Sequence, residues 1–220
     1  MSELSAIIAG GTGLIGGHLL RHLAADPAYG TVTALLRREI EVPDGVTAKV
    51  IDMADMEAAA KDIAATHAFC ALGTTRKVAG SKQAFAAVDR DLVIAFAKGA
   101  RAGGANAFAG VSSIGAARNT PNFYLKTKGE MEKGVADQMF PCLTFAHPGL
   151  LKGNRSERRA GEELGQILSP VTDALMQGPL RKYRSIEGET VAKALIAAVK
   201  EGRLGTRRLT YRALNDLAKG

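Results

Sequence analysis

Short apolar runs alternate along the chain with longer segments in which apolar side chains recur every three or four positions. Short runs rich in β-branched residues are typical of buried strands, and the longer period is typical of amphipathic helices. Alternation of the two predicts successive βα units around a parallel sheet. We therefore expect strands near residues 4–9, 31–36, 48–51, 68–72, 105–111, 142–146 and 207–210.

Amphipathic helices are expected between these strands, because apolar side chains recur there at helical spacing. The last of them should begin around Glu187 and end at Gly202, where glycine favours a helix stop. Residues 152–184 differ, since they carry charges, glycines and two prolines, and we interpret them as a small cap over the carboxyl edge of the sheet. The helical faces consist of Ile15, Leu19 and Leu23, of Phe85, Val88, Leu92 and Phe96, and of Val191, Leu195 and Val199.

The composition, with 46% apolar and 23% charged residues and no internal repeat, is that of one globular domain over residues 1–220. No apolar run reaches the roughly 18–20 residues that a membrane span requires. The first residues also lack the basic region and cleavage pattern of a secretory signal, so we expect a cytoplasmic protein without a membrane span. Cys70 and Cys142 lie in apolar runs without metal-ligand spacing, which predicts two buried thiols.

The net charge of +7 favours an anionic partner, for which nucleotide phosphates, nucleic acid and an acidic membrane are the candidates. The basic residues are spread along the chain, aromatic residues make up only 5%, and the sequence contains no nucleic-acid-binding motif. Nucleic acid is therefore not expected as a partner.

An apolar strand at residues 6–9 runs directly into a glycine-rich turn and then into a helix. In this context Gly10, Gly13 and Gly16 predict a dinucleotide site, although a loop that merely tolerates glycine is the alternative. The first glycine allows a tight turn, the second lets the backbone approach a pyrophosphate, and the third lets the helix pack on its strand. Phosphates then bind the N–H groups at the start of the helix. The fold class that follows is an α/β Rossmann-type doubly wound parallel sheet with helices on both faces. Residues Gly10, Thr12, Gly13, Leu14, Ile15 and Gly16 are assigned to the cofactor.

The end of the second strand indicates which dinucleotide binds. An acidic residue about 20 positions after the glycine turn accepts the ribose hydroxyls of NAD, whereas arginine accommodates the 2′-phosphate of NADP. Arg37 stands 21 residues after Gly16, and a guanidinium binds phosphate through two parallel hydrogen bonds, so NADP(H) is preferred. NAD(H) remains the alternative, because Glu39 could take the acidic role. Asp52 is assigned to the adenine amino group, with a carboxylate that only closes a turn as the alternative.

Six short motifs resemble, in order, the short-chain dehydrogenase/reductase superfamily, and they cover about residues 5 to 150. They are GGTGLIG at 10–16, DM at 52–53, ALGTT at 71–75, VSS at 111–113, YLKTK at 124–128 and HPG at 147–149. The longer segments CALGTTRKVAGSKQAFAAVDRD, SSIGA, YLKTKGEME and HPGLLKGNR resemble its atypical branch of TIP30-like NAD(P)-binding proteins. That narrower resemblance runs almost to the C-terminus.

The resemblance implies that Tyr124 is the general acid or base for a carbonyl or hydroxyl group and that Ser113 orients the substrate. Lys128 would favour the phenolate form of the tyrosine and bind the nicotinamide ribose. The spacing of Tyr124 and Lys128 places both on one helix face, although ordinary surface helices carry the same pattern. Pro121 and Asn122 provide a helix start just before them. Ser113 precedes Tyr124 by only eleven residues, fewer than is common in the family, so a serine that satisfies backbone groups at the strand end is the alternative.

The resemblance also implies further contacts with the cofactor. The turn of Leu72, Gly73 and Thr74 would lie beside the adenosine, with a plain tight turn as the alternative. His147 takes a position where many relatives have arginine, and we interpret it as a strand-end residue rather than a base. The remaining residues assigned to the cofactor are Met53, which follows Asp52 in the motif, and Pro148 and Leu150, in a segment that passes beside the nicotinamide in relatives.

Two hypotheses follow. The first is an NADP(H)-dependent oxidoreductase that acts on a small carbonyl or hydroxyl substrate, in which Tyr124, Lys128 and Ser113 are catalytic. The second is a non-catalytic NADPH-binding regulator that acts through a protein partner. A bulky sugar nucleotide is not expected, because only about 70 residues follow the sixth strand. Both a monomer and a homodimer are compatible with the sequence.

Overall fold

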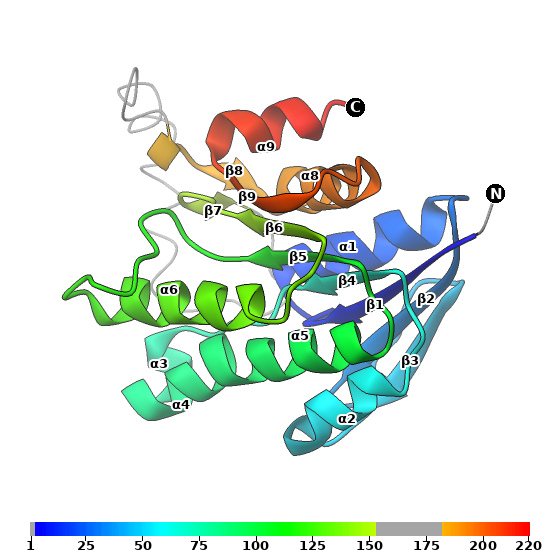
Figure 1. Cartoon of the computed structure of the whole chain (residues 1–220), viewed down its shortest axis with the longest axis horizontal. Coiled ribbons are helices and arrows are strands. Elements are labelled where there is room, and N and C mark those ends of the chain that lie inside the picture. The colour runs from blue at the N-terminus through cyan, green and yellow to red at the C-terminus, as the bar shows by residue number, and fades with distance from the viewer. Residues whose placement is uncertain (1–2, 153–181) are drawn as a thin grey trace.

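The computed structural model describes residues 3–152 and 182–220, and a seven-stranded parallel sheet runs through them (Figure 1). The strands lie in the order β3-β2-β1-β4-β5-β6-β9, so the order reverses between β1 and β4. In open sheets of this kind, ligands bind outside the carboxyl ends of the strands at that reversal. The predicted doubly wound Rossmann-type fold is thereby confirmed. The strands are β1 (Leu4–Ala9), β2 (Tyr29–Leu36), β3 (Val46–Val50), β4 (His67–Cys70), β5 (Ala107–Val111), β6 (Cys142–Ala146) and β9 (Gly205–Leu209).

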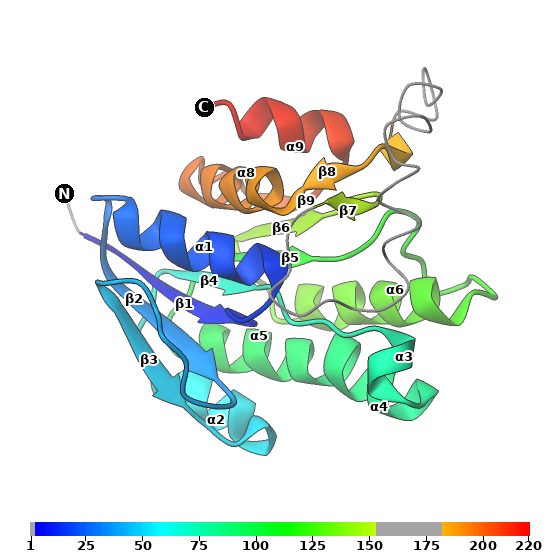
Figure 2. The same cartoon turned by 180° about the vertical axis from the view of Figure 1, so that it is seen from behind.

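Helices cover both faces of the sheet (Figure 2). One face carries α1 (Leu14–Ala25), α8 (Gly188–Lys200) and α9 (Tyr211–Leu217), and the other carries α2 (Met56–Lys61), α5 (Val93–Ala102) and α6 (Phe123–Ala136). The neighbouring β1 residues Ile7 and Ile8 are both fully buried, one in the apolar cluster of each face. Burial on both faces explains why the central strands read as continuous apolar runs.

The stretch between β4 and α5 departs from the predicted helix. It contains α3 (Arg76–Ala79), α4 (Lys82–Ala86) and a π-helical segment, η2 (Ala87–Leu92). Of the predicted apolar face, Leu92 packs against the apolar cluster under α2 and α5, but Val88 is only partly buried and joins neither cluster, whereas Asp89 is buried. The prediction was wrong at Val88, because the wider turn of a π-helix rotates residues relative to a regular helical stripe.

The proposed cap of residues 152–184 lies largely outside the described residues. The structure describes its two flanks, β7 (Leu151–Lys152) and β8 (Ile186–Glu187), which pair in parallel. Within the described ranges, no helix is long and apolar enough to cross a membrane. Cys70 is buried as predicted, and burial raises the pKa of its thiol to about 12. Cys142 is only half-buried, because it begins the strand β6, so the prediction of a second buried thiol was wrong.

Candidate functional site

The turn between β1 and α1 is shaped by two glycines. Gly10 has a φ of +88°, and a Cβ there would lie 2.4 Å from the backbone carbon of Ala71. A Cβ on Gly16 would lie 2.0 Å from the carbonyl oxygen of Gly10. The first glycine therefore permits a close approach to the end of β4, and the third lets α1 pack against the turn, as the motif predicts.

The first backbone N–H groups of α1 have no partner within the helix. Its N-cap residue is Gly13, no side chain among residues 3–152 and 182–220 caps it, and its first turn holds no acidic residue. Gly13 is exposed, and a Cβ there would meet only ordinary contacts, the nearest at 3.5 Å from the oxygen of Gly10. Packing within the described chain therefore does not require this glycine, whereas a bound pyrophosphate would. Thr12 and Leu14 flank this uncapped helix start, and Ile15 is buried beneath it.

Neighbouring glycines on α1 allow a matched test of this packing. We expect Gly16→Ala to lower the free energy of unfolding by about 3 kcal/mol or more, because its Cβ meets backbone atoms that cannot rotate away. Gly17→Ala is the control, since its Cβ would be 3.8 Å from the nearest atom and alanine favours a helix by about 1 kcal/mol. Urea unfolding of both variants and of the unsubstituted chain measures these changes in the free energy of unfolding. Equal stability of the two would contradict the packing argument.

The residues assigned to the adenosine end lie after β2, β3 and β4. Arg37 and Glu39 are exposed directly after β2, at the carboxyl edge where the glycine turn also lies. Asp52 accepts a hydrogen bond from the backbone N–H of Ala54 at 3.0 Å and caps the short helix η1 (Met53–Asp55). In this structure Asp52 therefore closes a turn, which is the alternative role considered for it from the sequence. Met53 packs against the apolar cluster under α2 and α5.

The turn after β4 is held by a buried ion pair. Asp89 accepts a hydrogen bond from the backbone N–H of Thr74 at 2.8 Å, and its other oxygen lies 2.7 Å from the ammonium of Lys128. Both side chains are nearly inaccessible, with exposed fractions of 2% for Asp89 and 5% for Lys128. Gly73 lies against the same carboxylate, since a Cβ there would be 3.5 Å from it. Leu72 packs against the apolar cluster below this turn. The structure thus brings the turn at 72–74 and the predicted lysine together through Asp89.

Helix α6 presents the predicted tyrosine and lysine on one face. It begins as expected, because the side chain of Asn122 accepts a hydrogen bond from the N–H of Leu125 at 3.1 Å. Tyr124 is partly buried, and its ring centroid lies 5.8 Å from that of Phe85 on α4. Lys128 is one turn further along and buried.

The loop after β5 is held against α6. Ala117 donates a backbone hydrogen bond to the carbonyl of Leu125 at 3.2 Å, and a Cβ on Gly129 would lie 2.5 Å from the backbone of Ala117. The short connection therefore returns to the first turns of α6. Ser113 lies at the start of this loop and is partly buried, with its hydroxyl 3.4 Å from the carbonyl oxygen of Ile114.

A second buried polar network lies one turn beyond Lys128. One oxygen of Glu132 accepts hydrogen bonds from the hydroxyl of Ser112 and from Nε2 of His147, both at 2.6 Å. Its other oxygen accepts a hydrogen bond from Arg208 on β9 at 2.7 Å. Burial favours the neutral form, but the hydrogen bonds from His147 and Ser112 outweigh it and hold the pKa of Glu132 below its ordinary value. Glu132 thereby ties α6 to the ends of β5 and β6 and to β9.

The two remaining residues assigned to the cofactor, Pro148 and Leu150, lie in the segment after β6 and differ in burial. Pro148 is buried and Leu150 is 47% exposed. Leu150 accepts a backbone hydrogen bond from Ile186, the first residue of β8, at 2.9 Å. His147 is buried directly after β6, and its Nε2 is bound to Glu132, so its place at the strand end agrees with the prediction. That it is not a base stays a prediction.

Two buried residues of this region, Glu132 and Asp89, were not identified as site residues from the sequence. Glu132 continues the four-residue spacing of Tyr124 and Lys128, and that spacing was a usable signal. Asp89 gave a weaker signal, because it becomes buried only through the π-helical turn of η2. Such turns are frequent at functional sites.

Comparison with known proteins places this geometry in a family. A model described as NAD(P)H-binding matches residues 10–202. The chain belongs to this NAD(P)H-binding family. Protein HTATIP2 of Rattus norvegicus is 35% identical over 171 residues, which are 76% of this chain and 70% of that protein. The mitochondrial protein FMP52 of Candida albicans is 29% identical over 211 residues, which are 90% of this chain and 89% of that protein.

Solved structures with low sequence identity share the fold. The UDP-glucose 4-epimerase of Thermotoga maritima, solved with UDP-glucose, superposes with a TM-score of 0.70 at 14% identity and covers 98% of this chain and 82% of its own. The enzyme WbmG of Bordetella bronchiseptica, solved with NAD, gives a TM-score of 0.68 at 14% identity and covers 95% of this chain and 73% of its own. These neighbours share the Rossmann-type fold of this chain.

Proposed function

We propose that this chain is an NADP(H)-dependent oxidoreductase that acts on a small carbonyl or hydroxyl substrate. The observation that carries the proposal is the turn at Gly10, Gly13 and Gly16, which leads into an uncapped helix start in a chain of the NAD(P)H-binding family. Free N–H groups at a helix N-terminus favour a pyrophosphate through both hydrogen bonds and the helix dipole.

Arg37 supports NADP(H) over NAD(H). Its side chain is exposed at the end of β2, and a guanidinium binds a phosphate monoester with two parallel hydrogen bonds. NAD(H) would instead require an acceptor for the ribose hydroxyls, for which Glu39 is the nearby candidate.

Titration with the two reduced cofactors tests this preference. We expect NADPH to bind more tightly than NADH. Arg37→Glu should lower the affinity for NADPH at least about tenfold, because a hydrogen bond to a charged group contributes about 1.5–3 kcal/mol. The affinity for NADH should change much less. Arg203→Glu is the matched control, since this exposed arginine precedes β9, at the opposite end of the strands, and the change in net charge is the same. Absence of binding to either cofactor in folded, cofactor-free protein would contradict the proposal.

The proposed chemistry uses α6 and the loop before it. The nicotinamide, when bound, supplies or accepts a hydride. Tyr124 donates a proton to the carbonyl oxygen in the direction of reduction and takes it back in the direction of oxidation. Ser113 donates a hydrogen bond that orients the same oxygen. Lys128 has three N–H donors, and Asp89 accepts one of them. The ammonium can therefore also donate hydrogen bonds to a ribose hydroxyl and to the tyrosine oxygen. Substrate-dependent oxidation of NADPH is the assay for this activity.

A second candidate is a non-catalytic NADPH-binding regulator. Two observations favour it: the short spacing from Ser113 to Tyr124, and the ion pair that neutralises Lys128. Similarity to protein HTATIP2 is compatible with either candidate. The regulator predicts that NADPH changes which proteins are captured by the chain and that Arg37→Glu abolishes this change.

The compartment, the substrate and the oligomeric state of this chain are expectations from its sequence. The cytoplasm stays a prediction, since fungal relatives of this chain are named mitochondrial proteins. The substrate is expected to be a small molecule, and both a monomer and a homodimer remain expectations.

A further inference from the structure

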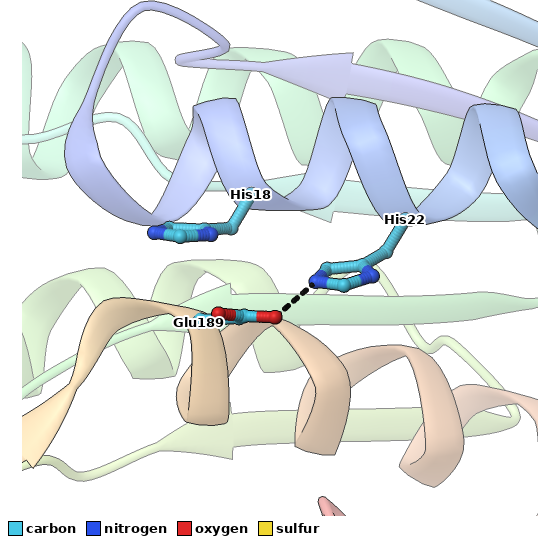
Figure 3. Close-up of side chains that lie close together, drawn as sticks. All are labelled: His18, His22 and Glu189. Carbon is cyan, nitrogen blue, oxygen red and sulfur yellow. Dashed lines mark hydrogen bonds and ion pairs between the residues drawn. The ribbon is translucent and has the colours of Figure 1, made fainter.

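A polar cluster joins α1 to α8 on the face of the sheet opposite α6. His18 and His22 lie one turn apart on α1, and Glu189 lies at the beginning of α8 (Figure 3). The two helices pack closely at this end, since a Cβ on Gly188 would lie 2.7 Å from the side chain of Leu14. The cluster is thus held between two rigid helices, and all three side chains are partly buried.

The three side chains bring potential ligand atoms close together. One potential ligand atom from each of the three lies within 4.8 Å of those of the other two. Nε2 of His22 lies 3.1 Å from a carboxylate oxygen of Glu189, and the two imidazole rings are stacked at an interplanar angle of 13°. Ligand atoms of a tetrahedral Zn²⁺, each about 2.0–2.1 Å from the ion, are about 3.4 Å apart, so small rotations of partly exposed side chains are sufficient to close the site.

The residue types are those that bind Zn²⁺ and similar ions. Two histidines four residues apart on one helix, with a carboxylate from a second helix, make a donor set of two nitrogens and one oxygen. Imidazole suits zinc, copper, iron and nickel, whereas Mg²⁺ and Ca²⁺ prefer oxygen donors alone.

Two cations compete with a metal at this site. Arg21 donates a hydrogen bond to Nδ1 of His18 at 3.0 Å, and Lys193 lies 2.9 Å from Glu189. A metal bound to His18 displaces the arginine, because an imidazole that accepts from Arg21 carries its proton on the other nitrogen. Both contacts are at the exposed side of the cluster, where ion pairs contribute about 0–1 kcal/mol. Their loss is therefore a small cost against metal coordination.

We infer that His18, His22 and Glu189 bind one divalent transition-metal ion of the Zn²⁺ class. Three protein ligands leave a fourth position for water or another small ligand. The bound ion joins α8 to the helix whose N-terminus faces the glycine turn, so it stabilises the folded chain in proportion to its binding. This inference does not depend on the proposed oxidoreductase activity.

Metal titration of the full chain, free of any histidine tag and stripped with a chelator, tests the site. Calorimetry with Zn²⁺ alone should give one ion per chain and a higher melting temperature. Co²⁺ should give the visible absorption of a tetrahedral or five-coordinate ion without the charge-transfer band of a thiolate, since Cys70 and Cys142 are not in the cluster. Failure of Zn²⁺ to bind would overturn the inference.

Single substitutions distinguish this cluster from another site. His22→Ala and Glu189→Gln should each weaken Zn²⁺ binding at least about tenfold, whereas Lys193→Gln and Arg21→Gln should leave it equal or tighter. Glu57→Gln is the matched control, because Glu57 is also a half-exposed glutamate with a lysine at 2.8 Å, but on α2. Unchanged affinity in both ligand variants would place the metal elsewhere and refute the site. The Co²⁺ spectrum of the unsubstituted chain reports on the ligands even where a variant fails to fold.

Discussion

Replacing Tyr124 by phenylalanine is expected to lower substrate-dependent NADPH oxidation by about 10²–10⁴-fold, the usual contribution of a positioned general acid. Only the phenolic O–H is lost, because the phenylalanine ring can keep the contact with Phe85, whose centroid lies 5.8 Å away. Cofactor affinity should therefore change by less than about threefold, and the effect should appear in kcat rather than in nucleotide binding. The measurement is a steady-state assay on the carbonyl substrate that gives the highest turnover in a screen.

Tyr211→Phe is the matched control for this experiment. Tyr211 is also partly buried, but it begins α9 on the opposite face of the sheet, so loss of its hydroxyl should leave turnover unchanged. Turnover that persists in Tyr124→Phe at the level of the control would exclude Tyr124 as the acid. NADPH binding without turnover on any carbonyl substrate would move the regulatory candidate ahead.

The sheet could be predicted from the sequence because each central strand is buried on both faces. Ile7 and Ile8 in β1 belong to opposite apolar clusters, so the run has no polar interruption and its ends are visible. The predicted bounds of β1 and β6 agree with the structure. Helix starts were also visible where a side chain caps the backbone, as Asn122 does for α6. These signals are local, so they can be recognised in the sequence without knowledge of the tertiary structure.

The polar interior could not be predicted in the same way. The sequence favours Ser113, whose role stays a prediction, but it carries no sign that the hydroxyl of the adjacent Ser112 donates to a buried glutamate on α6. That contact joins residues 20 positions apart, and only the packing of α6 on the sheet brings them together. Asp89 was hidden for another reason, because a π-helical turn does not follow the 3.6-residue period from which buried faces are inferred.

The largest effect on stability is expected at the buried ion pair of Lys128 and Asp89. Lys128→Met should lower the free energy of unfolding by about 3–5 kcal/mol, since it leaves a carboxylate that is only 2% exposed without its cation. For a chain of this size, the melting temperature should fall by about 6–20 °C. The exposed pair of Lys98 and Glu57, with side chains 58% and 47% exposed, gives the control, and Lys98→Met should cost less than about 1 kcal/mol.

A double-mutant cycle separates this charge effect from lost packing. Asp89→Asn retains an oxygen that can accept the hydrogen bond from the N–H of Thr74, but it leaves the ammonium of Lys128 buried without a counter-charge. Each single variant should therefore be strongly destabilised, whereas the double variant should recover much of the loss, because neither buried charge remains. Additive losses would show that the two side chains stabilise the chain independently, through packing rather than through their charges. The same variants report on the turn at 72–74: if Asp89 holds it through the N–H of Thr74, then Asp89→Asn should preserve NADPH affinity better than Asp89→Ala, which has no side-chain acceptor.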